Sequence, residues 1–229
     1  MAKYDPMENR STEDYIKKIY SLAGKGKSVT TTELARHLKI GNGSVTAMMK
    51  KLAAKRLIEY EPYRGVSITK AGRHLALRVV RRHRLWEMFL ARFLGYSWEE
   101  IHEEAERLEH VTSDELERRL DRVLGHPKVD PHGHPIPDAR CAIVEPAGRA
   151  LVEFGPGDRV QVVSVSDSDS DLLQYATKIG LKLDTPLTVV KRMTFDGSMV
   201  LKVGAKERVV SSRFAGSIFV RPKTRKNTE

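Results

Sequence analysis

The sequence has very little cysteine: Cys141 is the only one among 229 residues. A disulfide within the chain and a zinc site built from several cysteines are therefore excluded. No run of about 18 consecutive apolar residues occurs, so a transmembrane helix is excluded as well. The first ten residues are polar and contain no apolar segment, so we expect no secretory signal and a cytoplasmic protein. We expect Cys141 to be a half-buried thiol in a linker.

Motifs of common hydrolases are also missing. No Gly-x-Ser-x-Gly segment occurs, and no residues that would activate a nucleophile flank Cys141. From His102 the sequence reads His-Glu-Glu-Ala-Glu, so the second histidine of the His-Glu-x-x-His zinc motif is absent. We predict that the protein is not an enzyme. A metal-dependent hydrolase with a basic binding head is the alternative from another functional class.

Charge is distributed unevenly along the chain, whose net charge is +10. Residues 1–82 contain 18 Lys and Arg against 7 Asp and Glu, a net charge of +11. Residues 83–140 contain 8 against 13, or −5, and residues 141–229 contain 14 against 10, or +4. The basic first third favours binding to nucleic acid, and the acidic, histidine-rich middle favours binding to cations. Chance asymmetry of solvated surfaces is the alternative.

The first part of the sequence has the element order of a winged helix-turn-helix, in which the second helix of the motif enters the major groove of DNA. Apolar spacing predicts the helices, with Ser11 as the first cap, and Ile40-Gly41-Asn42-Gly43 predicts a tight turn with positive φ angles. A generic small helical domain is the alternative. We expect helices at 13–22, 31–38 and 44–55 and strands at 57–60 and 66–68, joined by a turn at 62–65.

Three further helices, and then a β-rich region interrupted by one more helix, are expected downstream. Ser97 and Glu100 have the spacing of a capping box, and residues 126–140, with four of the ten prolines, predict an ordered linker. The broad apolar surface of the helix at 69–94 indicates a dimer face, or a surface that packs on the wing. Short strands with glycine turns predict a small barrel. The helices are expected at 69–94, 97–110, 113–124 and 171–179, and the strands at 159–165, 187–193, 199–203, 208–211 and 217–220.

Two helices present stripes of potential metal ligands. His83 and Glu87 are four residues apart and therefore share a helix face. The next helix carries His102, Glu106, Glu109 and His110 within an arc of roughly 100°. If the stripes face each other, they form a cage for a metal ion. One solvated acidic surface is the alternative, because further glutamates crowd the second helix.

Two segments resemble the diphtheria toxin repressor family of metal-activated transcriptional repressors. They are Arg82-His83-Arg84-Leu85, and His102-Glu103-Glu104-Ala105-Glu106-Arg107-Leu108-Glu109-His110-Val111 followed by Ser113-Asp114-Glu115-Leu116-Glu117. The resemblance extends over the whole chain and implies a mainly α fold with a β part. The implied domains are a winged helix-turn-helix at 1–72, a helical dimerisation and metal-binding domain with a proline-rich linker at 73–140, a C-terminal SH3-like (FeoA-like) β-barrel at 141–222 and a basic tail at 223–229.

The resemblance also implies two metal sites per subunit, of which the primary one consists of Asp14, Glu106, Glu109 and His110. The iron-sensing branch has methionine and cysteine in place of Asp14 and Glu106, and hard oxygen ligands suit Mn²⁺. We therefore expect the manganese-sensing branch, with Fe²⁺ as the alternative metal. Two-domain manganese sensors have a glutamate where this chain has Lys17, which argues against their close binuclear cluster here.

The ancillary site of three-domain members corresponds to His83, Glu87 and His102, completed by ligands from the linker or the SH3-like domain. The nearest matches for these ligands are Asp130, His132 and Asp167. The alternative for all three is an ordinary polar loop.

The resemblance implies a homodimer that binds a double-stranded, near-palindromic DNA operator, with neither a membrane nor a small-molecule substrate as a partner. We expect the metal to neutralise the carboxylates and tie the first helix to the dimerisation domain, which sets the spacing of the recognition helices. A DNA-binding protein that needs no metal is the remaining alternative. Asn42, Gly43, Ser44, Thr46 and Ala47 are expected to face the groove, and Lys39, Lys50, Lys51 and Arg64 to contact phosphates.

Overall fold

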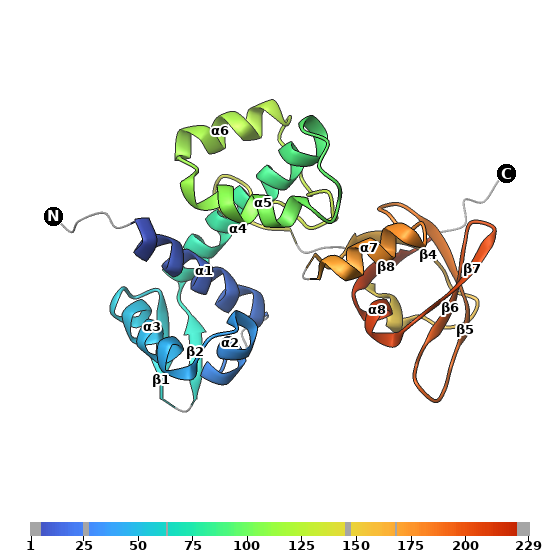
Figure 1. Ribbon diagram of the computed structural model, residues 1–229, viewed down its shortest axis with the longest axis horizontal. Helices are drawn as coiled ribbons and strands as arrows, with labels where there is room; N and C mark the ends of the chain where they lie inside the picture. Colours follow the sequence, from blue (N-terminus) through green and yellow to red (C-terminus); the bar gives the residue numbers. More distant parts are fainter. Residues whose placement is uncertain (1–5, 25–27, 63, 145–147, 168, 224–229) are drawn as a thin grey trace. The chain divides into compact units, whose positions relative to one another are not determined.

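The fold comes from a computed structural model, which describes residues 6–24, 28–62, 64–144, 148–167 and 169–223 (Figure 1). The chain forms two compact units: the first comprises residues 1–83, 107–117 and 137–142, and the second comprises residues 84–106, 118–136 and 143–229. Helix α4 (Lys70–Phe93) contributes to both units, so the division into three consecutive domains stays a prediction. Tyr63 of the expected turn and the basic tail after Lys223 lie outside the described residues.

The first unit contains the expected winged helix-turn-helix. Its helices form because apolar side chains recur at helical spacing, and these side chains meet in one core. Ile16, Ile19, Leu34, Met49 and Leu52 are fully buried there. The elements are α1 (Pro6–Ala23), α2 (Thr31–Leu38), α3 (Asn42–Ala54) and the antiparallel hairpin of β1 (Ile58–Glu61) and β2 (Gly65–Ile68), followed by the start of α4.

Three local predictions for this unit were wrong. Helix α1 begins at Pro6, so Ser11 lies inside the helix and is not its cap. The residue with a positive φ between α2 and α3 is Lys39, at 56°, because the chain turns at the end of α2, where the Lys39 N–H bonds to the Ala35 carbonyl. Gly41 is extended, with a φ of −71°, and α3 begins directly after it, two residues before the predicted start.

The helical part of the second unit is built from α4 after His83, α5 (Ile101–Leu108) up to Glu106 and α6 (Asp114–Val123) from Arg118 onward. A small core of Leu85, Leu120, Leu124 and Ile136 joins α4, α6 and the linker. Phe89 packs against this core, and Phe93, which stacks on Phe89, is 53% exposed. The apolar surface of α4 therefore extends beyond the core, and its role as a dimer face stays a prediction.

The helix expected at 97–110 is shorter in the structure. Glu100 accepts hydrogen bonds from N and Oγ of Ser97 at 3.1 and 2.5 Å, and α5 starts only at Ile101. Helix α5 ends at Leu108, whose carbonyl accepts a 2.7 Å hydrogen bond from the Thr112 hydroxyl, and η1 (Glu109–Val111) is a 3-10 helix. The prediction of one continuous α-helical stripe of ligands was therefore wrong beyond Leu108, because a 3-10 helix advances about 120° per residue.

The rest of the second unit is a β domain with the sheet order β3-β8-β4-β5-β6-β7, in which all neighbours are antiparallel. Its core contains Leu151, Val162, Leu173, Leu201 and Ile218, and the expected SH3-like fold is confirmed. Sequence periodicity missed β3 and α8, because they are too short to show one. The elements are β3 (Arg149–Ala150), η2 (Leu151–Glu153), β4 (Arg159–Val165), α7 (Ser170–Lys178), β5 (Pro186–Arg192), β6 (Met199–Val203), β7 (Lys206–Val210), α8 (Ser212–Gly216) and β8 (Ile218–Pro222). Among the described residues, no helix has the length and apolar character needed to cross a bilayer.

Candidate metal centres and DNA-binding surface

The first unit brings together three of the four predicted primary ligands. Asp14 lies on α1, Glu109 and His110 lie on η1, and one ligand atom of each is within 4.8 Å of the other two. His110 Nε2 is 2.9 Å from Asp14 Oδ1 and 3.4 Å from Glu109 Oε1, while His110 Nδ1 is 2.7 Å from Glu13 Oε2. Glu13 was missed, because a carboxylate next to Asp14 on a helix gives no separate sequence signal.

His110 is surrounded by carboxylates. Burial lowers the pKa of its imidazole, but the hydrogen bonds to Asp14 and Glu13 and the charge of Glu109 outweigh burial and raise the pKa to about 9. The ring therefore holds a proton at neutral pH unless a cation takes the place of that proton. A metal ion needs an unprotonated ring nitrogen, so protons and metal ions compete at this position.

A lysine is the second neighbour of Glu109. Lys17 Nζ donates to both Glu109 oxygens, at 2.9 and 2.8 Å. His83 Nδ1 is 2.6 Å from Glu109 Oε2, and because a carboxylate only accepts, Nδ1 carries the proton of this contact. His83 lies beside Glu109 in the first unit, and its assignment to the ancillary site stays a prediction. In the neutral His83 ring, the lone pair is then on Nε2, as in histidines that bind metal and donate to a carboxylate.

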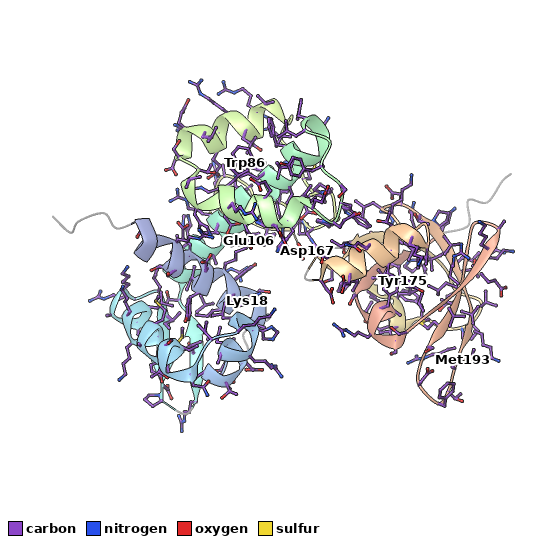
Figure 2. All side chains as sticks on the ribbon, in the orientation of Figure 1. Lys18, Trp86, Glu106, Asp167, Tyr175 and Met193 are labelled. Carbon is purple, nitrogen blue, oxygen red and sulfur yellow. The ribbon has the colours of Figure 1, made fainter. Side chains whose placement is uncertain are left out.

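The second unit gathers most of the predicted ancillary ligands. Glu87 on α4 is fully buried, and its Oε1 lies 3.6 Å from His102 Nδ1 and 3.7 Å from His132 Nδ1. Glu87, His132 and Asp167 each place one ligand atom within 4.8 Å of the others. Glu106 on α5 and Asp167 after β4 are both labelled in Figure 2, and Glu106 is 4.0 Å from His102 Nε2. The assignment of Glu106 to the primary site stays a prediction.

His132 is the most informative residue of this group. Its Nε2 is 2.9 Å from the Trp98 carbonyl oxygen, and its ring stacks on Trp98. A carbonyl only accepts, so Nε2 carries the proton, and the neutral ring presents a lone pair at Nδ1. That nitrogen is buried, has no hydrogen-bond partner among the described residues and faces a Glu87 oxygen. Two facing acceptors in a buried site are stabilised by a cation between them, so this geometry fits a metal ion.

Asp130 and His134 lie beside this group. Asp130 Oδ1 accepts the backbone N–H groups of His132 and His134, at 2.8 and 2.9 Å, so Asp130 shapes the loop that holds His132. Its Oδ2 lies 3.3 Å from Arg84 Nε and 3.3 Å from His134 Nδ1, and a role as a ligand stays a prediction. Burial lowers the pKa of His134, but Asp130 and Asp167 raise it above its usual range. His134 was missed, although it is one of the three histidines of the linker.

The donor atoms of both groups are carboxylate oxygens and imidazole nitrogens. Cys141 is half-buried as expected, and burial raises the pKa of its thiol. It belongs to none of the potential ligand groups among the described residues. Oxygen and nitrogen donors suit Mn²⁺, Fe²⁺ and Zn²⁺, and both groups lack the sulfur ligands that favour softer or later metals.

The predicted groove-facing residues lie on the first turns of α3. Four of them, Asn42, Gly43, Ser44 and Ala47, are exposed. The Thr46 hydroxyl donates its hydrogen to the Asn42 carbonyl at 2.9 Å, within the helix. A methyl group added at Gly43 would meet no protein atom within 4 Å, so the fold does not require glycine there. The predicted phosphate contacts Lys39, Lys50 and Lys51 are exposed, as is Arg64, which pairs with Glu61 at 3.2 Å.

A hollow of about 600 Å³ lies beside α3, between the start of α2 and the wing. It combines threonine hydroxyls with a lysine and a tyrosine, which are groups that contact phosphate oxygens in DNA complexes. Of its lining residues, only Thr46 and Lys50 were predicted to contact DNA, because the others lie outside the predicted recognition helix. The lining consists of Thr30, Thr31, Thr32, Thr46, Lys50, Tyr60, Pro62 and Gly65.

Three protein-family models match the chain. "Iron dependent repressor, N-terminal DNA binding domain" matches residues 7–66, and "Iron dependent repressor, metal binding and dimerisation domain" matches residues 69–138. The "FeoA domain" model matches residues 149–222. The three matches follow one another along the chain and together include both metal-ligand groups and α3.

Curated relatives and solved structures agree with these models. The iron-dependent repressor IdeR of Mycobacterium tuberculosis is 38% identical over 147 residues, which are 64% of this chain and 59% of that protein. The chain thus spans less than two thirds of this relative. IdeR of Mycobacterium leprae is 37% identical over 212 residues, 87% of this chain and 91% of the relative. A solved "Manganese-dependent transcriptional repressor complex with manganese" is 36% identical, with a TM-score of 0.87 over 93% of this chain and 100% of its own.

Proposed function

The chain belongs to the iron-dependent repressor family, which includes the diphtheria toxin repressor, and we propose that it represses transcription in response to Mn²⁺. The family consists of transcriptional repressors rather than enzymes, which removes the hydrolase alternative. The regulated process would be metal-ion homeostasis. The proposed working form is a homodimer on a near-palindromic operator, in line with the match to a dimerisation domain over residues 69–138.

The observation that carries the choice of Mn²⁺ is the ligand set of the first unit. Asp14 and Glu109 offer hard carboxylate oxygens beside the His110 imidazole, within 4.8 Å of one another. We propose Glu106, three residues before Glu109, as the fourth ligand. Three carboxylates and one imidazole favour Mn²⁺, whereas a sulfur ligand would favour later metals. When bound, the ion supplies two positive charges that offset the clustered carboxylates.

We propose that the protein residues convert metal binding into DNA binding through α1. Asp14 on α1 and Glu109 and His110 on η1 would hold the same ion, which fixes α1 against η1. Helix α1 also contributes Ile16 and Ile19 to the core that carries α3, so a fixed α1 restrains the orientation of the recognition helix. Asn42, Gly43, Ser44, Thr46 and Ala47 would then contact bases, and the four cations Lys39, Lys50, Lys51 and Arg64 would contact phosphates.

The second-unit group is proposed as an ancillary metal site. Glu87, His102, His132 and Asp167 would be its ligands, and His83, which α4 carries one turn before Glu87, would be a further one. Asp167 follows β4, so an ion held there would tie the SH3-like domain to the linker. The backbone of His132 supports this link, since its carbonyl accepts a 2.9 Å hydrogen bond from the Val165 N–H at the end of β4.

Fe²⁺ is the second candidate for the activating ion, and specific observations favour it. The curated relatives at 37 and 38% identity are named iron-dependent repressors. The solved structures with similar folds include one with manganese and others described with Cd²⁺ and Zn²⁺. Fe²⁺ also accepts carboxylate and imidazole ligands, so the same residues would hold it.

The test is a DNA-binding isotherm on an operator-like duplex at fixed salt, with chelator and then with Mn²⁺, Fe²⁺ or Zn²⁺. We expect Mn²⁺ to tighten binding by at least tenfold, about 1.4 kcal/mol. A stronger effect of Fe²⁺ would replace the proposed ion and leave the repressor mechanism in place. Equal binding with chelator and with every metal would contradict the metal-dependent mechanism itself.

A further inference from the structure

A second hollow lies within the SH3-like domain and has a volume of about 700 Å³. Sites that bind small molecules commonly measure roughly 300–1,000 Å³, so this hollow has the size of a ligand site. It is bounded by residues 177–180 at the end of α7, by residues 182–186 that lead into β5, and by the hairpin of β6 and β7. None of its lining residues belongs to either metal-ligand group, and the proposed function does not use it.

Positive charge dominates the lining of the second hollow. Its one carboxylate among the described residues is Asp184, and its four cations are Lys178, Lys182, Lys206 and Arg208. Asp184 is already paired, because its Oδ1 lies 3.6 Å from Nη2 of Arg221. The three lysines are exposed and make no ion pair with a described residue. The described part of the chain therefore leaves the positive charge of this hollow uncompensated.

The nearby edge of the sheet adds to this positive character. Among the described residues, no further strand pairs with the outer edge of β7. In an antiparallel pair, alternate residues direct their N–H and C=O groups away from the partner strand. Val209 is such a residue, because its carbonyl accepts a 3.0 Å hydrogen bond from the Tyr175 hydroxyl (labelled in Figure 2), and Glu207 is another. The Glu207 carbonyl accepts a 3.3 Å hydrogen bond from Arg208 Nη1, so the backbone groups left open at the described edge are N–H donors.

The chemistry of these groups selects the class of ligand. Lysine side chains, arginine side chains and backbone N–H groups all bind phosphate oxygens. A phosphate group carries up to two negative charges and three acceptor oxygens, so one group can contact several of the four cations. A carboxylate has one charge and two oxygens and would contact fewer of them. Apolar side chains of Ile179, Leu183 and Val203 also line the hollow, and they strengthen the attraction because they exclude water from it.

We propose that the second hollow binds phosphate groups through Lys178, Lys182, Lys206 and Arg208. The phosphate belongs either to a small phosphorylated compound or to a DNA backbone, and the contacts are of the same kind in both cases. The inference goes beyond the proposed function and does not depend on it, because neither metal-ligand group takes part. It gives the SH3-like domain a binding role of its own, separate from the ancillary metal site.

The test compares two double variants of the full chain, with a chelator present and in a buffer free of phosphate. Lys182→Ala with Lys206→Ala removes two cations from different borders of the hollow. Lys191→Ala with Arg192→Ala is the matched control, because it removes the same charge from β5, where both side chains are exposed and lie outside the lining. Circular dichroism verifies that both variants are folded.

Calorimetric titrations use pyrophosphate and, separately, a DNA duplex without operator sequence as probes. The Lys182 and Lys206 variant is expected to bind at least one probe about tenfold more weakly than the wild type, because it lacks two charge-assisted hydrogen bonds. The control is expected to bind both probes as tightly as the wild type. The proposed contacts of α3 with DNA are the same in both variants, so a difference between the variants reports on the hollow.

The outcomes also identify the source of the phosphate. Weaker pyrophosphate binding by the Lys182 and Lys206 variant, but not by the control, would support the inference and indicate a free phosphorylated compound. An effect confined to the duplex would support it and indicate the DNA backbone, and an effect on both probes would support it for both sources. Equal affinities of the two variants for both probes, or a wild type that binds neither probe at millimolar concentrations, would overturn it. A failure of Mn²⁺ to tighten operator binding would leave this result unchanged, so the two proposals fail separately.

Discussion

Single residues in the two metal-ligand groups give their imidazoles different hydrogen-bond partners. His110 lies among the carboxylates of Asp14, Glu13 and Glu109, which favour the protonated ring. His132 donates its Nε2 proton to the Trp98 carbonyl and presents an unprotonated Nδ1. A metal ion must displace a proton at the His110 ring, because the carboxylates raise its pKa to about 9.

The first prediction concerns pH. His110, with a pKa of about 9 in the folded chain against an ordinary value of 6.5, carries a proton below pH 9. Mn²⁺ affinity at the first-unit centre is therefore expected to rise as the pH increases from 6.5 toward 9, by at most about tenfold per pH unit. Binding should release about one proton, which calorimetry in buffers of different ionisation enthalpy measures. Asp14→Ala, which damages only this centre, should abolish that release, and pH-independent binding to the wild type would refute the assignment.

The second prediction concerns His132. His132→Gln removes the lone pair that faces Glu87 while keeping a side chain of similar length. We expect the second-unit site to lose at least tenfold in Mn²⁺ affinity, since loss of one ligand or its support commonly costs 10–100-fold. His126→Gln is the matched control, because His126 is in the same region but exposed and paired with Asp121. Equal metal affinity in both variants and the wild type would show that His132 is no ligand.

At the scale of elements, α3 presents glycine where the fold does not need it. Gly43 lies in the first turn of an α-helix and has no positive φ, and a methyl group added to it would have open space within 4 Å. Glycine in a helix costs roughly 0.5–1 kcal/mol relative to alanine. We infer that glycine at this position serves the proposed contact with DNA, because a groove can approach the backbone most closely where there is no side chain.

The third prediction tests this role of Gly43. Gly43→Ala is expected to keep or raise the free energy of unfolding, by up to about 1 kcal/mol, because alanine is the better helix former. Operator affinity is expected to fall by at least tenfold, because the added methyl group enters the space of the base edges. Gly216→Ala, in α8 and equally open, should change stability alone. Full operator affinity in Gly43→Ala would remove α3 from the proposed base contacts.

The elements with strong periodicity could be predicted from the sequence, and their ends could not. Helix α2 matched its predicted range, whereas α1 started earlier, at Pro6. At the end of α5, the Leu108 carbonyl accepts a bond from the Thr112 hydroxyl four residues later, a local contact that apolar periodicity does not contain. For the candidate sites, residue type and spacing predicted some of the observed neighbours, such as His102 near Glu87, and their role as ligands stays a prediction. Glu13, Lys17 and His134 contact the candidate ligands because separate segments pack together, and spacing within one helix does not contain this information. Of the three, only Lys17 was identified from the sequence, through the family resemblance.

At the scale of the whole molecule, the proposed mechanism is a thermodynamic linkage between the metal site and the DNA-binding surface. If Mn²⁺ increases the affinity for the operator, then the operator must increase the affinity for Mn²⁺ by the same factor. This linkage distinguishes a metal ion that regulates DNA binding from one that only stabilises the fold. An ion of the second kind would bind with equal affinity in the presence and absence of DNA.

The most direct measurement is therefore a Mn²⁺ titration of the full chain with and without saturating operator duplex, at one salt concentration and one pH. The account predicts that the operator tightens Mn²⁺ binding by at least tenfold, about 1.4 kcal/mol, and by the same factor by which Mn²⁺ tightens operator binding. Identical Mn²⁺ affinities in the presence and absence of the operator would contradict it.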